Sequence, residues 1–195
     1  SVVVTDLLES EIFNRMFPKL YHHLKLVSST PIRNMATLGG NFVNASPIGD
    51  MTAWFLALDA EIEFNNGRSL PLKDFYLGYK QMNKAEDEMI TKIRFKKDFT
   101  HFNFEKVCKR TYLDIASVNT AISLKVADNK IIHAHISAGG VSPIPLYLRQ
   151  TSDFLMGREI SKSTVLEAND ILQAEISPIS DVRGSEKYKR LLAKQ

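Results

Sequence analysis

The sequence predicts an α+β protein, with short helices and strands mixed in its first half and an antiparallel sheet with helices in its second. Three observations lead to this class. An apolar helical pattern at residues 51–58 is followed at once by strand-like alternation at 60–64. Further alternating runs, separated by turn residues, fill much of the second half. With 195 residues, 44% of them hydrophobic, the chain can bury a sizeable core in one or two domains.

The first elements are expected to be a short strand and two helices. Residues 2–4 are typical of a short buried strand, and Asp6 with Glu9 can cap a helix that begins at Leu7. Pro18 suits the first turn of the next helix. The apolar face of that helix would carry Leu20, Tyr21, Leu24 and Val27.

A segment of turns and then a helix and strands complete the first half. Residues 28–46 hold small residues, two adjacent glycines and a proline, which indicates turns with closely approached backbone. Asp50 is placed to cap the helix at 51–58. The strand at 60–64 leads through residues 65–68, which favour a hairpin turn, into residues 70–72.

A domain boundary is predicted just before residue 100. Residues 88–95 alternate like a strand, with positions 89, 91, 93 and 95 on one face. The basic, polar stretch 96–101 then interrupts the apolar pattern without a helix signature. We therefore predict one domain at residues 1–98 and a second at residues 99–195.

The second domain is predicted to be an antiparallel meander with helices. Strands are expected at residues 102–110, 116–126 and 130–137, with a turn at Asp128 and Asn129. Two glycines and two prolines at residues 139–145 end the strands. Helices are expected at residues 151–155, 163–174 and 188–192.

Composition excludes several classes of function. The 25 Lys and Arg residues against 22 Asp and Glu residues leave a net charge of +3, too small to indicate binding to nucleic acid or to an anionic membrane. The single cysteine, Cys108, cannot supply a thiolate cluster, so we expect no iron–sulfur centre in this chain. No apolar run reaches the about 18 residues of a membrane helix, and no signal peptide is evident. We therefore expect a cytoplasmic protein without membrane insertion.

One segment carries the candidate chemistry. It reads Thr37, Leu38, Gly39, Gly40 and Asn41, and polar residues follow at Asn44, Ser46 and Asp50. Glycines without a Cβ let a ligand approach the backbone, and the neighbouring hydroxyl and amide groups suit an anionic or polyhydroxylated ligand. The same residues also suit a tight turn in which Asn41 and Asp50 act as caps.

A resemblance to a known family gives this segment more specific meaning. Residues 32–41 (IRNMATLGGN), with the Ala-Ser-Pro at 45–47 and Asp50, resemble the FAD-binding subunits of molybdenum hydroxylases such as xanthine, carbon monoxide and nicotinate dehydrogenases. The resemblance continues, in order and at sensible spacing, through residues 56–60, 70–75, 78–79, 88–93, 106–110, 114–116, 139–143 and 181–185 with Tyr188. Nearly the whole chain is covered.

The resemblance implies a fold and a set of cofactor-binding residues. The expected fold is a vanillyl-alcohol-oxidase-like FAD-binding second subdomain followed by a carbon monoxide dehydrogenase flavoprotein-like C-terminal domain. The chain would begin where the family's second FAD subdomain begins, so we expect the first subdomain, with its Gly-rich pyrophosphate loop, to be absent from these residues. The resemblance implies flavin contacts at Thr37, Leu38, Gly39, Gly40, Asn41, Asn44, Ser46, Asp50, Ile90 and Lys106.

The resemblance also implies a function and partners. The chain would be an oxidoreductase subunit that passes electrons from iron–sulfur clusters through FAD to NAD or another acceptor. Molybdopterin and the iron–sulfur clusters would lie in partner subunits, so no residue of this chain is nominated as a general acid, general base or metal ligand. Because half of the FAD site is expected to be elsewhere, the isolated chain is expected to hold FAD weakly and to be inactive.

Two alternatives remain open. The chain could be a docking module that assembles the iron–sulfur and molybdenum subunits without holding FAD, in which case the purified protein would lack flavin colour. It could also be another enzyme of the same flavin fold, such as a cell-wall enolpyruvyl reductase. The Asp-Val-Arg-Gly-Ser sequence at 181–185 argues against the latter, because it resembles the hydroxylase subunits.

Other conspicuous residues receive structural interpretations. His22 and His23 are adjacent on a helix and point about 100° apart, so we predict surface or interface roles and no shared metal site. Cys108 is expected to be an ordinary, partly buried thiol. Trp54 and Phe55 are expected in the core or an interface. The basic residues near the C-terminus, Lys189, Arg190 and Lys194, are expected to form a solvated helix end.

Overall fold

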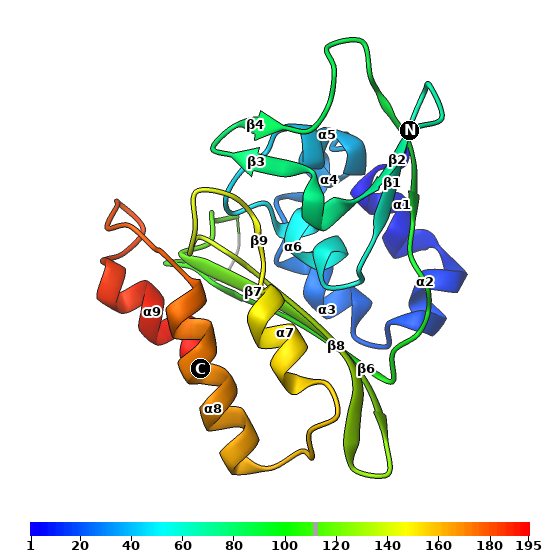
Figure 1. Ribbon diagram of the computed structural model, residues 1–195. Helices are drawn as coiled ribbons and strands as arrows, with labels where there is room; N and C mark the ends of the chain where they lie inside the picture. The colour runs from blue at the N-terminus through cyan, green and yellow to red at the C-terminus, as the bar shows by residue number, and fades with distance from the viewer. Residues whose placement is uncertain (111–112) are drawn as a thin grey trace.

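The computed structural model describes residues 1–110 and 113–195 (Figure 1). Six short helices and three small strand pairings come first, and a four-stranded sheet with three helices follows. The first helices are α1 (Val4–Glu9), α2 (Glu11–Met16), α3 (Leu20–Lys25), α4 (Thr30–Arg33), α5 (Leu38–Val43) and α6 (Asp50–Leu56). The later helices are α7 (Arg149–Leu155), α8 (Lys162–Glu175) and α9 (Glu186–Lys194).

The predicted strand at the start of the chain is wrong. Val3 makes only an isolated bridge to Thr37, and α1 begins at Val4. The reason is that the Asp6 carboxylate accepts the Val3 N–H at 2.8 Å, so Asp6 closes the first turn and the helix starts a turn earlier than predicted. Helix α2, which the sequence did not predict, is capped by the Ser10 hydroxyl.

A three-stranded antiparallel sheet follows α6, with strand order β2-β1-β5. Its strands are β1 (Glu61–Phe64), β2 (Ser69–Pro71) and β5 (Ile90–Arg94). The predicted hairpin is therefore confirmed. The predicted alternation in β5 is wrong, because a bulge opposite Glu63 and Phe64 leaves Thr91 without a partner residue on β1. Ile90 and Ile93 consequently both pack against the same core.

Two short strands, β3 (Tyr76–Gly78) and β4 (Gln81–Met82), form a separate hairpin that follows the 3₁₀ helix η1 (Leu72–Asp74). The four-stranded sheet of the second half has the order β6-β7-β8-β9, with every pairing antiparallel. Its strands are β6 (His101–Val107), β7 (Val118–Ala127), β8 (Lys130–Gly139) and β9 (Leu146–Tyr147). This confirms the predicted meander. Asp128 and Asn129 form its turn with φ angles of 49° and 60°, a conformation that Asn and Asp tolerate well.

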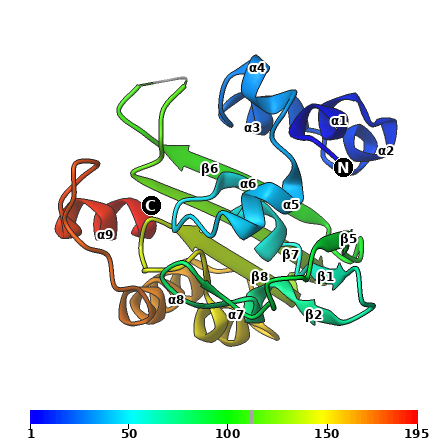
Figure 2. The same cartoon turned by 90° about the horizontal axis from the view of Figure 1, so that it is seen from above.

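The four-stranded sheet is covered on both faces. Figure 2 shows α5 and α6 over one face and α7 and α8 below the other, with α9 beside the end of the sheet. On the α6 side, Phe104 and Ala121 join the large core of the N-terminal helices. On the opposite side, Val118 and Ala138 pack with Leu172 and Ile176 of the C-terminal helical region. The sheet thus forms the central layer of the fold.

Helix α6 is the element most deeply enclosed, and its aromatic residues anchor the core. Trp54 is 1% exposed, and the centroid of its ring lies 4.4 Å from the ring centroid of Phe102 and 5.3 Å from that of Phe17. The prediction that Trp54 and Phe55 lie in the core is confirmed. His23 packs edge-on to Trp54 and is 2% exposed, so the predicted surface or interface role is wrong for this residue. Burial lowers the pKa of His23.

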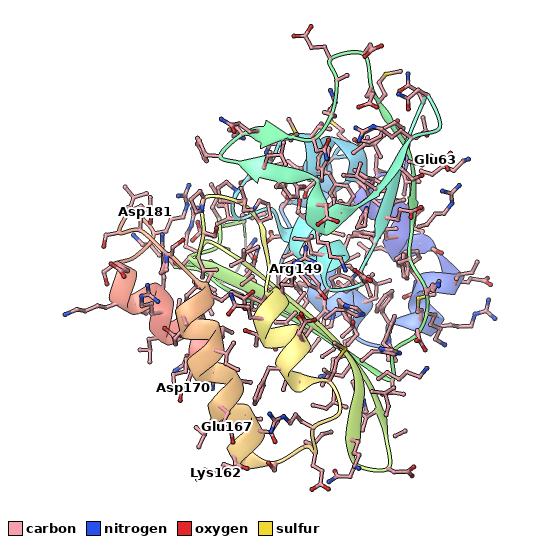
Figure 3. All side chains as sticks on the ribbon, in the orientation of Figure 1. Glu63, Arg149, Lys162, Glu167, Asp170 and Asp181 are labelled. Carbon is pink, nitrogen blue, oxygen red and sulfur yellow. The ribbon has the colours of Figure 1, made fainter. Side chains whose placement is uncertain are left out.

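Most charged residues of α8 lie on the outside of the molecule, whereas a lysine of α9 is buried. Figure 3 shows the labelled Lys162, Glu167 and Asp170 along the exposed side of α8. In α9, however, the Lys189 side chain is only 3% exposed and its Nζ lies 2.9 Å from Asp181. The predicted solvated helix end is therefore wrong at Lys189, because the segment 179–181 folds back over the helix and supplies the partner for this ammonium group.

Truncation of Trp54 should be strongly destabilising. The Trp54→Ala variant removes the central ring of the aromatic cluster, so we expect the free energy of unfolding to fall by about 3–5 kcal/mol in urea denaturation. Ile12→Ala is the control, because Ile12 is 61% exposed and its truncation should cost about 0.5 kcal/mol or less. Equal losses for the two variants would contradict the assignment of Trp54 as the core anchor.

Candidate functional site

The glycine pair of the candidate segment lies in the first turn of helix α5. Thr37 is the N-cap residue, and its Oγ1 accepts the Gly40 N–H at 3.0 Å. A Cβ at Gly40 would stand 2.7 Å from Thr37 Oγ1, so a larger residue at this position would force the Thr37 side chain to shift. The interpretation of this pair as a tight turn is therefore wrong, and so is the prediction that residues 28–46 consist of turns, because α4 and α5 lie within them.

Helix α6 is capped from α5, not by Asp50. The N-cap residue of α6 is Gly49, and Asp50 is the first helical residue. The side chain of Asn41 supplies the cap, since its Oδ1 accepts the backbone N–H of Thr52 at 3.1 Å and the Thr52 hydroxyl at 3.0 Å. The alternative in which Asn41 is a cap is thus confirmed, whereas the prediction that Asp50 caps α6 is wrong.

Asp50 instead joins a buried ion pair. Its Oδ2 lies 2.6 Å from Nζ of Lys106 on β6, and the two side chains are 13% and 3% exposed. Lys106 Nζ also donates to the Leu26 carbonyl at 2.9 Å, and Asn119 Nδ2 on β7 donates to Asp50 Oδ1 at 2.7 Å. Burial raises the pKa of Asp50, while Lys106 and Asn119 oppose that rise. Lys106 is therefore a buried lysine whose ammonium group is paired within the protein.

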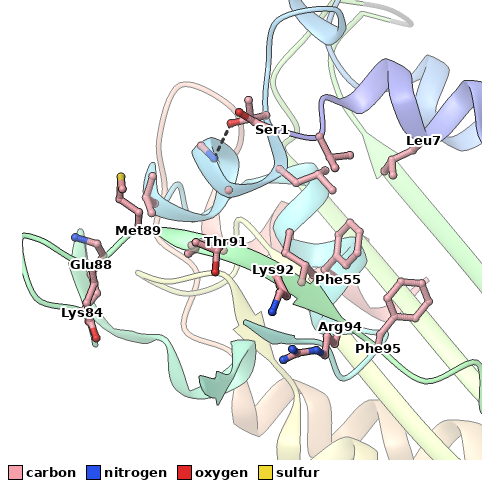
Figure 4. Close-up of a pocket in the computed structure, with 18 of the residues that line it drawn as sticks. Ser1, Leu7, Phe55, Lys84, Glu88, Met89, Thr91, Lys92, Arg94 and Phe95 are labelled. Atoms are coloured by element: carbon pink, nitrogen blue, oxygen red, sulfur yellow. Dashed lines mark hydrogen bonds between the residues drawn. The ribbon is translucent and has the colours of Figure 1, made fainter. Parts of the chain in front are cut away.

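A groove of about 730 Å³ runs between α5 and β5 (Figure 4). Thr37, Leu38, Gly39 and Gly40 contribute to one wall, and Ile90 lies in the other. A Cβ on Gly39 would lie 3.8 Å from Ile90 Cβ, so this glycine keeps the space between helix and strand open. The groove therefore combines apolar walls with exposed backbone, which is typical of small-molecule sites.

The rim of this groove is charged, and the carboxylate of Glu88 holds it together through several hydrogen bonds. Glu88 accepts bonds from Arg68 Nε and Nη2, both at 2.7 Å, and from the Ala85 N–H at 2.8 Å. These donors lower the pKa of Glu88 to about 2. Figure 4 shows Glu88 and Lys84 at one end of the groove and Lys92 and Arg94 along β5.

The other candidate residues line a second hollow, of about 540 Å³, which lies at the second half of α5 and the start of α6. Asn41, Asn44, Ser46, Asp50 and Lys106 all contribute to it. The Asn44 side-chain and backbone oxygens accept from Nζ of Lys80, and Ser46 Oγ accepts the Ile48 N–H at 3.4 Å. The structure therefore divides the ten predicted residues into two groups of five, one at the groove beside the start of α5 and one at the hollow beside its second half.

Sequence reasoning missed two residues of this region, Thr52 and Asn119. Thr52 completes the bond pair with Asn41, and a Thr at the third position of a helix gives no particular signal. Asn119 is 69 positions away from Asp50 in the chain, so no local motif could connect them. Only the alternation of β7, which places Asn119 on the same face as Ala121, indicated that it points inward.

Within residues 1–110 and 113–195, no group of three or more His, Cys, Asp or Glu side chains is arranged to hold a metal ion. Across the same residues, no helix combines the length and apolar character needed to cross a membrane.

Two family models match the chain. A model described as the FAD binding domain in molybdopterin dehydrogenase matches residues 1–95, and one described as the CO dehydrogenase flavoprotein C-terminal domain matches residues 104–195. The boundary at residues 98 and 99 stays a prediction.

Relatives of known identity cover the chain. It is 30% identical to the carbon monoxide dehydrogenase medium chain of Hydrogenophaga pseudoflava, over 99% of this chain and 69% of that protein. It is 32% identical to xanthine dehydrogenase 1 of Arabidopsis thaliana over 83% of this chain, but spans only 13% of that much longer protein. The solved carbon monoxide dehydrogenase from Hydrogenophaga pseudoflava superposes with a TM-score of 0.91 at 28% identity, covering 100% of this chain and 69% of that chain.

Removal of Lys106 should destabilise the protein strongly. Lys106→Met leaves Asp50 buried without its cation, so we expect a loss of about 3–5 kcal/mol in the free energy of unfolding by urea denaturation. The Asp50→Leu/Lys106→Met double variant should lose less than the sum of the single losses. Lys125→Met is the matched control, because its ion pair with Asp98 is exposed and should be worth under about 1 kcal/mol. A loss for Lys106→Met as small as that control would contradict the buried pair.

Acid should weaken the hydrogen bonds by which Glu88 holds the rim of the groove. The folded-state pKa of Glu88, about 2, lies below its ordinary value of 4.5, so Glu88 contributes stability that is present above pH 4.5 and is lost as the pH falls toward 2. Urea denaturation across this window should show a smaller pH dependence in Glu88→Gln than in wild type. Glu86→Gln, next to the rim and exposed, should retain the wild-type slope. An unchanged slope in Glu88→Gln would refute this role.

Proposed function

The chain belongs to the flavoprotein family of the molybdenum hydroxylases, and we propose that it holds part of an FAD molecule and relays electrons within such an oxidoreductase complex. Its partners would be an iron–sulfur subunit and a molybdopterin-binding subunit. Bound FAD would accept electrons from the clusters and deliver them to NAD or another acceptor. The task of the chain itself is to bind and orient the cofactor.

The observation that carries the proposal is the placement of α5. Its N-cap and first turn, Thr37 to Gly40, form a wall of the groove that Ile90 closes on the other side. Its second half and C-cap turn Asn41 and Asn44 toward the second hollow, where Asp50 and Lys106 lie. A long, flexible cofactor with an aromatic ring, a polyol chain and phosphates needs apolar surface, open backbone and side-chain acceptors, and the residues around α5 supply all of them.

Apolar and polar residues of this set would contact different parts of the cofactor. Leu38, Ile90 and the bare backbone at Gly39 offer flat apolar contact and exclude water from a ring. Asn44 and Asp50 offer oxygen atoms to hydroxyl groups, and the Lys106 ammonium compensates negative charge near them. No side chain of this set is required to transfer a proton.

A docking module without FAD is the second candidate, and one observation favours it. Asn41, Asp50 and Lys106 each have partners within the protein, as a helix cap and as a buried ion pair, so their presence can be explained without a ligand. The two candidates differ in a visible property. Protein purified together with its partner subunits should contain flavin if the chain is a cofactor subunit, and should lack it if the chain only assembles the complex.

A substitution at Gly39 tests the FAD site. Because a Cβ there lies at ordinary contact distance from Ile90, Gly39→Ala should fold, but its methyl group should crowd a flavin in the groove. We expect FAD affinity, measured by fluorescence titration, to fall about tenfold or more.

Lys187→Ala is the matched control, since Lys187 occupies the same second position in α9 and is exposed. It should leave both folding and FAD affinity unchanged. Equal FAD affinity in Gly39→Ala and wild type would exclude the groove as part of the cofactor site.

A further inference from the structure

Resting on the proposed FAD site, we propose that Asn119 is a positioning residue: it fixes the Asp50 carboxylate so that Asp50 accepts a hydrogen bond from an O–H or N–H group of the flavin cofactor. Asn119 touches no part of the second hollow itself. It acts from behind Asp50, from a strand of the other half of the chain, and none of the family motifs in the sequence includes it.

The side-chain amide of Asn119 is buried between Asp50 and the loop that precedes α6. Asn119 is 1% exposed, and its Nδ2 donates to Asp50 Oδ1 at 2.7 Å and to the Ile48 carbonyl at 3.2 Å. One amide group therefore holds both the carboxylate and the loop that leads into α6. Its Oδ1 has no hydrogen-bond partner among the residues that the structure describes. Since a buried acceptor without a partner is unfavourable, the donor half must account for the presence of this amide.

The backbone around Asn119 is shaped to receive it. A Cβ on Gly139 of the neighbouring strand β8 would lie 2.3 Å from Asn119 Oδ1 and 3.0 Å from the Pro47 carbonyl. The next amide, the Gly140 N–H, donates to the Pro47 carbonyl at 2.8 Å. Glycine at position 139 thus allows β8, Asn119 and the loop at 46–49 to meet, which leaves the amide little freedom to turn away from Asp50.

The consequence for Asp50 is a defined chemical preference. Lys106 occupies Oδ2 and Asn119 occupies Oδ1, and each carboxylate oxygen can accept a second bond. Asp50 lines the second hollow, so the remaining acceptor capacity is available to a ligand there. An ionised carboxylate accepts but does not donate. The site therefore selects a donor group, such as a hydroxyl of a polyol chain, and rejects an acceptor placed in the same position.

The experiment measures FAD affinity and stability in parallel. Asn119→Leu removes the donor with little change in size, and we expect the Kd for FAD in fluorescence titrations to rise about tenfold or more. Ser123→Ala is the matched control on the same strand, because Ser123 also makes one buried bond to the α6 segment, to the Ala57 carbonyl at 2.5 Å. It should lower the midpoint of urea denaturation to a similar extent without changing the Kd.

A double-mutant cycle separates positioning from a general structural role. In an Asp50→Asn background, Asn119→Leu should add little to the loss of affinity, because there is no carboxylate left to position. Additive losses would overturn the proposal, since they would mean that Asn119 acts independently of Asp50.

A near-isosteric variant covers the case in which Asn119→Leu fails to fold. In Asn119→Asp the new side chain can only accept hydrogen bonds when it is ionised. When it is protonated, its O–H can donate to Asp50 as the amide did. The ratio of its Kd to the wild-type Kd should therefore fall as the pH is lowered. The charged side chains of the neighbouring hollow are Asp50, which faces residue 119, Lys106 on β6 and Asp114 before β7. A ratio that does not change with pH would contradict the proposal.

The outcomes distinguish the two proposals. Wild-type protein that binds no FAD even when it is assembled with its partner subunits refutes the proposed function, and the role of Asn119 falls with it. Wild-type protein that binds FAD, with equal binding by Asn119→Leu, refutes the role of Asn119 alone.

Discussion

A buried ion pair ties together the two halves of the molecule. Asp50 stands at the start of α6, and Lys106 reaches it from β6 with its ammonium group almost fully removed from solvent. A charge buried in this way is tolerated only because each member finds further hydrogen bonds, to Leu26 and Asn119. Since these partners come from α3, β6 and β7, the pair fixes the orientation of α6 against the sheet.

Helix α6 is held along its whole length by side chains of the sheet. Ser137 on β8 donates to the Ala53 carbonyl at 2.6 Å, and Ser123 on β7 donates to the Ala57 carbonyl at 2.5 Å. Small polar residues at these inward positions let the helix lie close to the strands, and they also satisfy carbonyl groups at its C-terminal end. Trp54 and Phe55 complete the contact with apolar surface. The candidate site is thus built beside the most deeply enclosed helix of the fold.

Local patterns in the sequence predicted most elements but few of the bonds between them. The hairpin at residues 65–68, the meander and the C-terminal helices follow from periodicity and turn residues, which act over a few positions. The predictions fail where a residue from another helix or strand determines the environment of a side chain. His23 was predicted at the surface, but Trp54 packs against it and it is buried. Asp50 was predicted to cap α6, but Asn41 from the preceding helix makes the capping bond. The resemblance to flavoprotein subunits identified the residues around α5, while the division of these residues between two hollows required three-dimensional structure.

The bulge in β5 has a consequence for how this protein can change over evolutionary time. One unpaired residue, Thr91, rotates the strand so that Ile90 faces the glycines of α5 while Ile93 still meets the core. Insertion or deletion of a single residue between them would exchange the inner and outer faces of the strand, so that Ile90 and Ile93 could no longer face α5 and the core together. The segment is therefore intolerant of length variation, whereas the β7–β8 turn can vary in length without disturbing either hollow.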